Sequence, residues 1–382
     1  MSAYATYGAS MQERAPLLYA SEFDNSGYAA AARRYMRALR TVQEPLEWLP
    51  LINTQEGRLP TEDRAAAPAE QRSLFTTSTG HDTVLAHSMP QSWSHIREVR
   101  SPRRFIGQTV WEADPIPRRW YAELAAADEI WVPTHWNADV LRRSGVTVPI
   151  HVMPHAIEST PPSAPPMTWP SDRFMFLAIS TWERRKRPDL MLHAYLRAFN
   201  ADEPVTLVIK TGGAVVAWCC ESLIEQHTWW QVMNIVRQYP NPADVVLITD
   251  QWSDAEMAGL IESADCYVSL TSVEGWGLGA FDAAVAGVPV IITGYGGQLE
   301  WLGHDHTGLV PFEMVPADHP DTTMFEPGMT WALADVDAAA QLMRAAVDGS
   351  TAFVTDAPKL ANRLRTQYSE TAIGTLMQEA LR

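Results

Sequence analysis

The most constraining feature of this 382-residue sequence is a unit that recurs along it. Each unit consists of a short apolar run, a loop of turn-forming residues and a stretch with helical periodicity. Residues 17–42 form one such unit, LLYAS, EFDNSG and YAAAARRYMRALRTV, and residues 174–200 form another, FMFLAIS, TWERRKRPD and LMLHAYLRAFN. Strands that alternate with helices in this way build parallel sheets covered by helices. The pattern therefore predicts an α/β protein with doubly wound parallel sheets.

A proline-rich segment, STPPSAPPMTWPS at 159–171, separates the units into two groups. Its composition is typical of a linker, so we expect one domain over 1–160 and a second over 161–382. Two such domains place a cleft between the carboxyl ends of their strands, where open α/β sheets bind ligands. The polar stretch 54–73 lacks periodicity and is predicted to be a surface loop, and the tail from Asp335 is predicted to be helical.

Charge and composition exclude several classes of protein. The net charge of -16 opposes broad electrostatic capture of nucleic acid or of an anionic membrane. No apolar run reaches the roughly 18 residues of a membrane helix, and the first residues lack the pattern of a secretory signal. We expect a cytoplasmic protein without stable membrane insertion. Its cysteines, Cys219, Cys220 and Cys266, match neither a disulfide framework nor a zinc spacing.

Residues 271–300, TSVEGWGLGAFDAAVAGVPVIITGYGGQLE, combine many glycines with two acidic residues, Glu274 and Asp282. Glycines let a ligand approach the backbone closely, and a helix that begins among them offers amides and a dipole that favour an anion. A diphosphate is one such anion. The alternative is that the glycines serve only the tight packing of strand against helix.

Four blocks of the sequence resemble the family 4 retaining glycosyltransferases, which carry an E-x7-E motif and have the GT-B fold of two facing Rossmann-like domains. The blocks are FDNSGYAAAARRYMRAL, DEIWVPTHWNADVLRRSGVTVPIHVMPHAIE, WERRKRPDLMLHAYLRAF and SVEGWGLGAFDAAVAGVPVIITGYGG, in that order. The resemblance implies a cleft between the domains and a C-terminal helix that crosses back to the first domain.

The resemblance also implies roles for individual residues. Glu274 would face the transferred sugar, Lys186 and the amides of Gly277 and Leu278 would contact the diphosphate, and Asp282 would accept hydrogen bonds from the ribose hydroxyls. Further contacts with the donor are expected from Gly27, Arg184, Arg185, Trp276, Gly296 and Gly297.

The sequence departs from the family pattern at three positions. The second acid of the motif is Asp282, where the family has glutamate. Thr181 stands where the family has a cation, so either Arg184 or Arg185 supplies that charge. Glu112, in QTVWEAD, stands where a histidine is common, which makes it a candidate catalytic residue.

Two histidines have open interpretations. His87, at the end of the apolar run in LAHSMP, either faces the cleft and takes part in catalysis or is a satisfied histidine beneath a loop. His155, in MPHAIE before the linker, is better explained by packing or by a role at the hinge.

The expected function is the transfer of a hexose, with retention, from a nucleoside diphosphate sugar to a hydroxyl acceptor, without a metal or another cofactor. The acceptor stays open among a sugar, a lipid, a protein and a modified nucleic acid. Alternatives are a nucleotide-sugar epimerase of the same fold and a degenerate protein that binds the donor without turnover. A NAD-dependent oxidoreductase is disfavoured, because the loop FDNSGYAAA lacks the G-x-G-x-x-G fingerprint.

Overall fold

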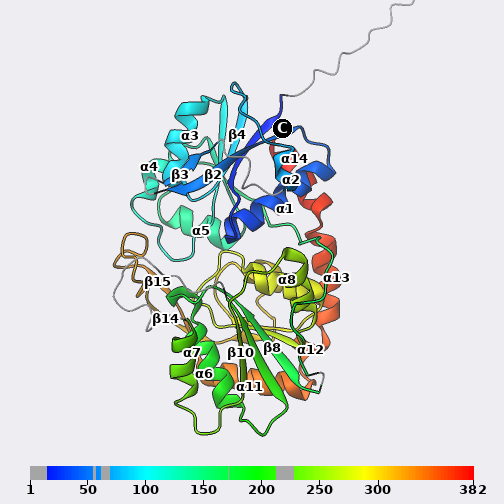
Figure 1. Cartoon of the computed structure of the whole chain (residues 1–382). Coiled ribbons are helices and arrows are strands. Elements are labelled where there is room, and N and C mark those ends of the chain that lie inside the picture. Colours follow the sequence, from blue (N-terminus) through cyan, green and yellow to red (C-terminus); the bar gives the residue numbers. More distant parts are fainter. Residues whose placement is uncertain (1–14, 55–56, 62–68, 171, 212–227) are drawn as a thin grey trace, which may run out of the picture.

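The computed structural model describes residues 15–54, 57–61, 69–170, 172–211 and 228–382. It consists of two α/β domains that lie one above the other, each built on its own sheet (Figure 1). We call the domain with the seven-stranded sheet the first domain and the one with the six-stranded sheet the second domain. The predicted α/β class is confirmed.

The first sheet has the order β3-β2-β1-β4-β5-β6-β7, with every pairing parallel except that of β3 with β2. One of its interior strands, β1, is buried at all six residues, as expected for a parallel strand with helices on both faces. The strands are β1 (Leu17–Glu22), β2 (Leu46–Thr54), β3 (Gly57–Pro60), β4 (Thr83–His87), β5 (Arg104–Gln108), β6 (Glu129–Val132) and β7 (Ile150–Val152).

The prediction of a surface loop over 54–73 is wrong in part. β3 pairs antiparallel with β2 in the register Leu51↔Pro60 to Thr54↔Gly57, and a short helix, α2 (Ala69–Arg72), follows. The polar composition conceals this strand because it lies at the edge of the sheet, where polar residues and proline are tolerated. Residues 55–56 and 62–68 of the predicted loop lie outside the described residues.

The second sheet is parallel throughout, with the order β10-β9-β8-β11-β12-β13. Its strands are β8 (Phe174–Ile179), β9 (Val205–Lys210), β10 (Asp244–Ile248), β11 (Cys266–Ser269), β12 (Val290–Thr293) and β13 (Leu309–Val310). The sequence analysis did not predict the antiparallel pair that follows, β14 (Phe312–Pro316) and β15 (Thr330–Ala334).

Helices cover both sheets, and their ends follow local capping rules. Ser26 caps α1 by accepting a hydrogen bond from the amide of Ala29, and Ser253 and Glu256, whose S-x-x-E spacing in the sequence predicts a capping box, form one at the start of α8. The longer helices are α1 (Gly27–Thr41), α3 (Trp93–Arg100), α5 (His135–Arg143), α6 (Pro188–Ala198), α7 (Thr228–Val236), α8 (Asp254–Glu262), α9 (Leu278–Ala286) and α11 (Val336–Asp348). The shorter ones are α4 (Trp120–Leu124), α10 (Leu299–Leu302), α12 (Ala352–Thr355) and the 3-10 turns at Pro90–Ser92 and Arg184–Lys186.

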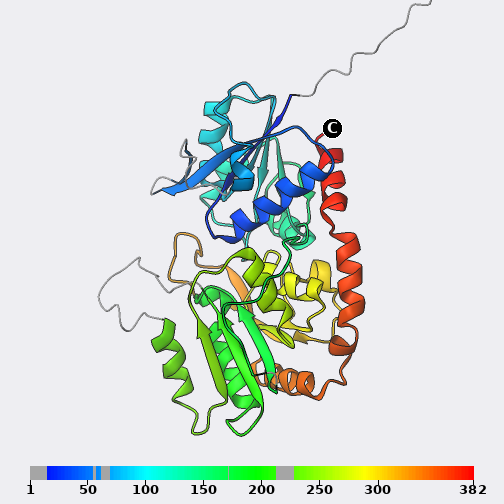
Figure 2. The ribbon, with the colours of Figure 1, turned by 45° about the vertical axis from the view of Figure 1, so that its right-hand side comes forward.

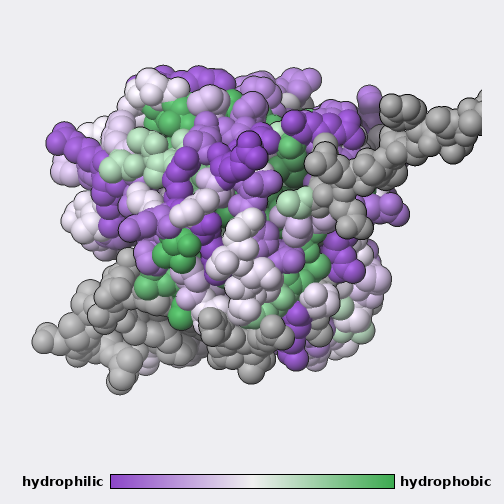
Figure 3. Space-filling model, turned by 90° about the horizontal axis from the view of Figure 1, so that it is seen from above, coloured by the Kyte–Doolittle hydropathy of each residue, from purple (hydrophilic) through white to green (hydrophobic). Residues whose placement is uncertain are grey.

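The outer surface of the first domain is largely hydrophilic. Seen from above in Figure 3, purple residues cover much of this face, and hydrophobic residues form small, separate areas. Within the part of the chain that the structure describes, no helix combines the length and the apolar character that crossing a membrane would require.

Two helices at the end of the chain, α13 (Ala357–Gln367) and α14 (Glu370–Ala380), run along one side of both domains (Figure 2). α14 packs against α1 so closely that a Cβ on Gly374 would lie 2.2 Å from the carbonyl oxygen of Ala38. Arg104 donates to the carbonyl groups of Ala380 and Leu381. The end of the chain therefore rests on the first domain, although α13 packs against α9 of the second.

The proline-rich segment connects β7 to β8 without a helix or strand of its own, and part of it is packed. The amide of Ser163 donates to the carbonyl of Ala255 over 2.9 Å, and a Cβ on Gly259 would lie 1.9 Å from the carbonyl oxygen of Ser163. Just before it, Glu158 accepts from Arg37 at 2.7 Å and lies 3.4 Å from Arg34. The segment is thus attached to α8, and its start is attached to α1.

Burial alone would raise the pKa of Glu158, but Arg34, Arg37 and Thr160 outweigh this and lower it from 4.5 to about 2. A lowered pKa stabilises the fold above pH 4.5, and this contribution disappears as the pH falls towards 2. We expect Glu158→Gln to reduce the free energy of unfolding at pH 7 by about 2 kcal/mol. The difference from wild type should shrink below pH 4.5, as measured by urea unfolding across pH. Glu262→Gln, an exposed carboxylate on α8, is the control, and a pH-independent difference would contradict the assignment.

Candidate active site

A cavity of about 630 Å³ lies between the two domains. It is bordered by the loops after β1, β4 and β5 of the first domain and by the loop after β8 and the start of α9 of the second. Carboxyl ends of strands from both sheets therefore face one space, as expected for open parallel sheets. Predicted site residues that line it are Gly27, His87, Glu112, Arg185, Lys186, Glu274, Trp276, Gly277 and Leu278.

A cluster of charged side chains lines the cavity. Lys186 Nζ contacts Glu274 Oε1 at 2.7 Å and Oε2 at 2.8 Å. Arg185 Nη1 lies 3.1 Å from Glu112 Oε1 and 3.7 Å from Glu274 Oε2, and Arg185 Nη2 donates to Glu183 at 2.9 Å. Because Glu112 belongs to the first domain and the other residues to the second, the cluster exists only where the domains meet.

Burial shifts the pKa values of Glu112 and Arg185 in different directions, and the neighbouring charges oppose the shift to different extents. Burial is the largest influence on Glu112 and raises its pKa, and the positive charges of Arg185 and Lys186 only partly oppose it. Burial acts to lower the pKa of Arg185, but Glu112, Glu183 and Glu274 outweigh it and leave that pKa raised. Glu112 therefore takes up a proton more readily than a free glutamate, while Arg185 keeps its charge.

α9 begins at the cavity. Its N-cap residue, Gly277, has φ +82°, a left-handed conformation that favours glycine, and Leu278 opens the helix. The first turn of a helix presents free amides and the positive end of the helix dipole. An anionic group in the cavity would thus meet backbone donors on one side and Lys186 on the other.

His87 faces the cavity and is also hydrogen-bonded within the protein, and its part in catalysis stays a prediction. It lines the cavity, and its Nδ1 shares a hydrogen bond of 2.7 Å with the hydroxyl of Tyr19. Burial lowers its pKa from 6.5 to about 3, so the imidazole is neutral at neutral pH. His155 also borders the cavity and packs its ring 5.2 Å from the rings of Tyr35 and Trp276.

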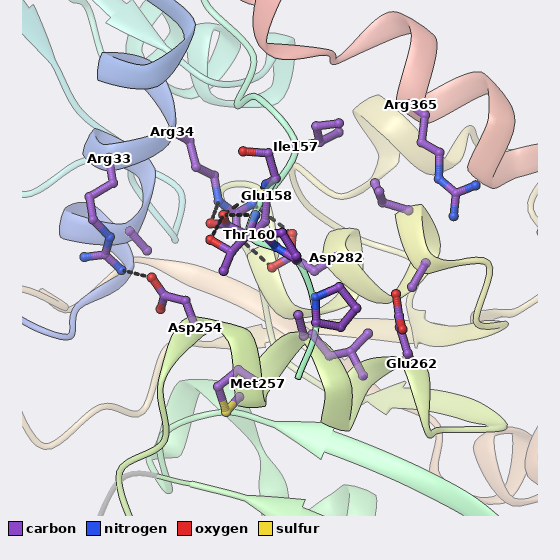
Figure 4. A pocket seen from close by; sticks show the side chains of 18 residues that line it. Arg33, Arg34, Ile157, Glu158, Thr160, Asp254, Met257, Glu262, Asp282 and Arg365 are labelled. Carbon is purple, nitrogen blue, oxygen red and sulfur yellow. Dashed lines mark hydrogen bonds and ion pairs between the residues drawn. The ribbon is translucent and has the colours of Figure 1, made fainter. Parts of the chain in front are cut away.

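Asp282 is not among the residues that line this cavity, and its expected contact with a ribose stays a prediction. Its two carboxylate oxygens accept from Arg34 of α1 at 2.8 and 2.7 Å. Asp282 and Arg34 border a second, smaller pocket of about 330 Å³, shown in Figure 4. At the same pocket, Arg33 donates a hydrogen bond to Asp254. The carboxylate thus forms an ion pair between the domains.

Three other residues that were predicted to contact the donor also do not line the cavity. Arg184 points to the surface and pairs with Asp318. Gly296 and Gly297 form a tight turn, where a Cβ on Gly297 would lie 2.0 Å from the carbonyl oxygen of Gly275. Packing, the alternative considered for the glycine-rich segment, explains these two glycines. Of the two candidates for the charge missing at Thr181, only Arg185 borders the cavity.

Several residues of the site were missed. Tyr28 borders the cavity and donates to the carbonyl of Val110 at 3.0 Å, which fixes the loop that carries Glu112. Its position directly after Gly27, at the start of the first helix, is a signal that the sequence contained. Tyr19 and Arg34, which do not line the cavity but pair with His87 and Asp282, gave no such signal, because those partners are 68 and 248 residues away in the sequence.

Metal ligands do not gather in the described residues: no three His, Cys, Asp or Glu side chains come together there in a way that could hold an ion.

Residues 163–346 match the family model described as Glycosyl transferases group 1, and this segment contains Arg185, Lys186, Glu274 and Gly277. A stretch of 182 residues is 26% identical to the human alpha-1,3/1,6-mannosyltransferase ALG2 and covers 46% of this chain and 41% of that protein. The chain thus matches less than half the length of this curated relative.

Similar solved structures extend further along the chain. The sucrose-phosphate synthase of Thermosynechococcus elongatus is 16% identical, with a TM-score of 0.65 over 97% of this chain and 98% of its own. The chain has the GT-B fold. The TarM protein of S. aureus, solved with fondaparinux, alpha-GlcNAc-glycerol and UDP, is 14% identical, with a TM-score of 0.52 over 76% of this chain and 53% of its own. At these identities the likeness concerns the fold alone.

A contact at Gly275 provides a test of how the domains meet. A Cβ on Gly275 would lie 1.8 Å from Val110 Cγ2 of the first domain. We expect Gly275→Ala to lower the free energy of unfolding by about 1–3 kcal/mol, because a methyl group would overpack the interface. Adding Val110→Ala should restore most of the loss in urea unfolding.

Gly27→Ala is the matched control, because the nearest atom to its added methyl is 4.0 Å away. If Gly275→Ala and Gly275→Ala/Val110→Ala are equally unstable, the closed contact does not occur in solution.

Proposed function

We propose that the protein is a retaining glycosyltransferase that transfers a hexose from a nucleoside diphosphate sugar to a hydroxyl acceptor. The observation that carries this proposal is the cluster of Lys186, Arg185, Glu274 and Glu112 beside the start of α9, in a cavity between two parallel sheets. The match of residues 163–346 to the glycosyltransferase group 1 model supports the class of reaction.

The second domain supplies what the donor needs. Lys186 and the first amides of α9 would bind the diphosphate, since cations and helix N-termini both favour phosphate oxygens. Glu274 would face the sugar, with its orientation fixed by the two contacts to Lys186. As the bond to the sugar breaks, negative charge grows on the diphosphate, and Lys186 and Arg185 stabilise it. We propose that these side chains stabilise the charge without a metal ion, so addition of EDTA should leave the rate of sugar transfer unchanged.

The first domain would hold the acceptor. Glu112, Tyr28 and His87 border the cavity from that side. Neutral His87 can donate or accept one hydrogen bond to a hydroxyl group without adding charge to the site. We propose a single displacement in which the acceptor attacks the face from which the diphosphate leaves, which gives retention, and in which the leaving diphosphate takes the proton of the acceptor hydroxyl.

A degenerate protein that binds the donor without turnover is the second candidate, and it is favoured by the two departures from the family motif, Asp282 and Thr181. Incubation with UDP- and GDP-hexoses, with and without simple sugar acceptors, separates the two. Release of nucleoside diphosphate together with a glycosylated product supports transfer, and binding without release supports the second candidate.

Glu274→Gln should reduce transfer by at least 100-fold while leaving nucleoside diphosphate affinity within about threefold, because the carboxylate is expected to contact the sugar and not the nucleotide. Rates of product formation and titration calorimetry measure the two effects. Glu300→Gln, a carboxylate of α10 that pairs with His135, is the control and should keep full activity. Wild-type turnover in Glu274→Gln would overturn the assignment of this residue.

Lys186→Met should weaken nucleoside diphosphate binding by about 10- to 100-fold, as expected when a charge-assisted contact to phosphate is removed. Titration calorimetry with UDP and GDP measures it. Lys359→Met, an exposed lysine on α13, controls for the loss of net positive charge. Unchanged affinity in Lys186→Met would move the diphosphate contact to Arg185.

A further inference from the structure

A second connection between the domains lies opposite the helices α13 and α14. Residues 317–329 join β14 to β15, and we call this segment the strap. Its base belongs to the second domain, where the amide of Asp335 donates to Pro311 at 2.8 Å and that of Ala332 donates to Ser272 at 3.1 Å. In Figures 1 and 2 the β14–β15 hairpin and its connection lie beside the gap between the domains, on the side away from α13.

The tip of the strap packs into the first domain. Phe325 stacks on Trp111 with 5.3 Å between the ring centroids and an interplanar angle of 27°. The amide of Arg118 donates to Glu326 Oε1 at 2.8 Å. The apolar cluster that contains Trp111 and Trp120 also includes four residues of the strap and of β15, which are Met324, Phe325, Met329 and Trp331. The strap is therefore part of the core of the domain that it touches.

Directly after the strap, backbone hydrogen bonds also join the two domains. Thr330, at the start of β15, donates to Asp114 at 2.9 Å, and Asp114 donates back to Thr330 at 3.3 Å. This antiparallel pair holds the loop that follows β5. Glu112 lies in that loop, next to Trp111, and its carboxylate is 3.1 Å from Arg185. The position of Glu112 in the charge cluster thus depends on contacts made by the strap.

These contacts restrict opening of the cleft. A hinge movement about the proline-rich linker and α13 would have to withdraw Phe325 and its neighbours from the first domain and break the pair formed by Asp114 and Thr330. We propose that residues 317–329 are an interdomain strap that keeps the cleft closed before any donor is bound and that positions Glu112 against Arg185. The part that concerns Glu112 rests on the proposed function, whereas closure of the cleft does not.

Solution scattering of the protein without ligand tests closure. We expect Phe325→Ala to have a larger radius of gyration than wild type and to be cut faster by protease within 317–329. Phe312→Ala, on β14 and 39% exposed, removes the same group from the same hairpin without touching the first domain and should match wild type. Equal radii for Phe325→Ala and wild type would overturn the strap, and so would contraction of wild type on addition of UDP or GDP.

A disulfide between the two domains should restore the closed arrangement in Phe325→Ala. Asp114 and Thr330 exchange both backbone hydrogen bonds, so their Cα atoms should lie about 5.5 Å apart, within the range that a disulfide spans. Asp114→Cys and Thr330→Cys introduced into Phe325→Ala should restore the wild-type radius when oxidised and lose it again on reduction. The single variant Asp114→Cys in the same background should not respond. Failure of the oxidised double variant to contract would contradict the strap.

Activity then tests the role of the strap in positioning. If Glu112 acts through its place in the cluster, Phe325→Ala should lower kcat by about 10-fold with a smaller change in KM for the donor, and oxidation of the cross-link should restore kcat. If Phe325→Ala has a larger radius of gyration but an unchanged kcat, the strap keeps the cleft closed but does not position Glu112 for catalysis. Absence of transfer in wild type would reject the proposed function and leave the scattering results intact.

Discussion

At Gly275 the two domains approach so closely that a methyl group would not fit between them, and the candidate site depends on this contact. A Cβ at this position would lie 1.8 Å from Val110, two residues before Glu112 in the sequence. Because the loop of the first domain can rest on bare backbone here, Glu112 reaches Arg185 and closes the charge cluster. The hydrogen bond from Thr134 to the carbonyl of Gly275, at 3.4 Å, lies at the same point. A larger residue would hold the domains apart and leave Glu112 without its partner.

Charge reinforces this contact on the side of α1. Arg33 and Arg34 lie one after the other on that helix and pair with Asp254 and Asp282 of the second domain. Arg34 is only 4% exposed, so its ion pair is screened by salt less than a surface pair would be. An ion pair that is buried and crosses domains costs desolvation, and it contributes more to a defined domain arrangement than to overall stability.

The sequence predicted most of what is local. The strand–loop–helix units, the capping box of Ser253 and Glu256, and the shared site of Lys186 and Glu274 all follow from spacing or from the resemblance to a family, and the structure has them. It could not predict the ion pair between Asp282 and Arg34, because no sequence pattern links residues 248 positions apart. The β14–β15 pair was missed for a related reason: its strands are short and their apolar pattern is mixed, because Phe312 and Met314 of β14 are exposed while Trp331 of β15 is buried against the first domain.

The packing of α14 on α1 has a consequence for the order in which the chain is made. Met36 and Leu39 of α1 share one apolar cluster with Ile373 and Met377 of α14. More than 300 residues separate the two helices in the sequence, and synthesis at about 5–20 residues per second takes tens of seconds to cover that distance. From the completion of β7 at Val152 until α14 is made, the first domain has all of its own strands but lacks the helix that covers α1. Until the last helix emerges from the ribosome, this apolar face of α1 is therefore exposed to solvent and available for non-native contacts.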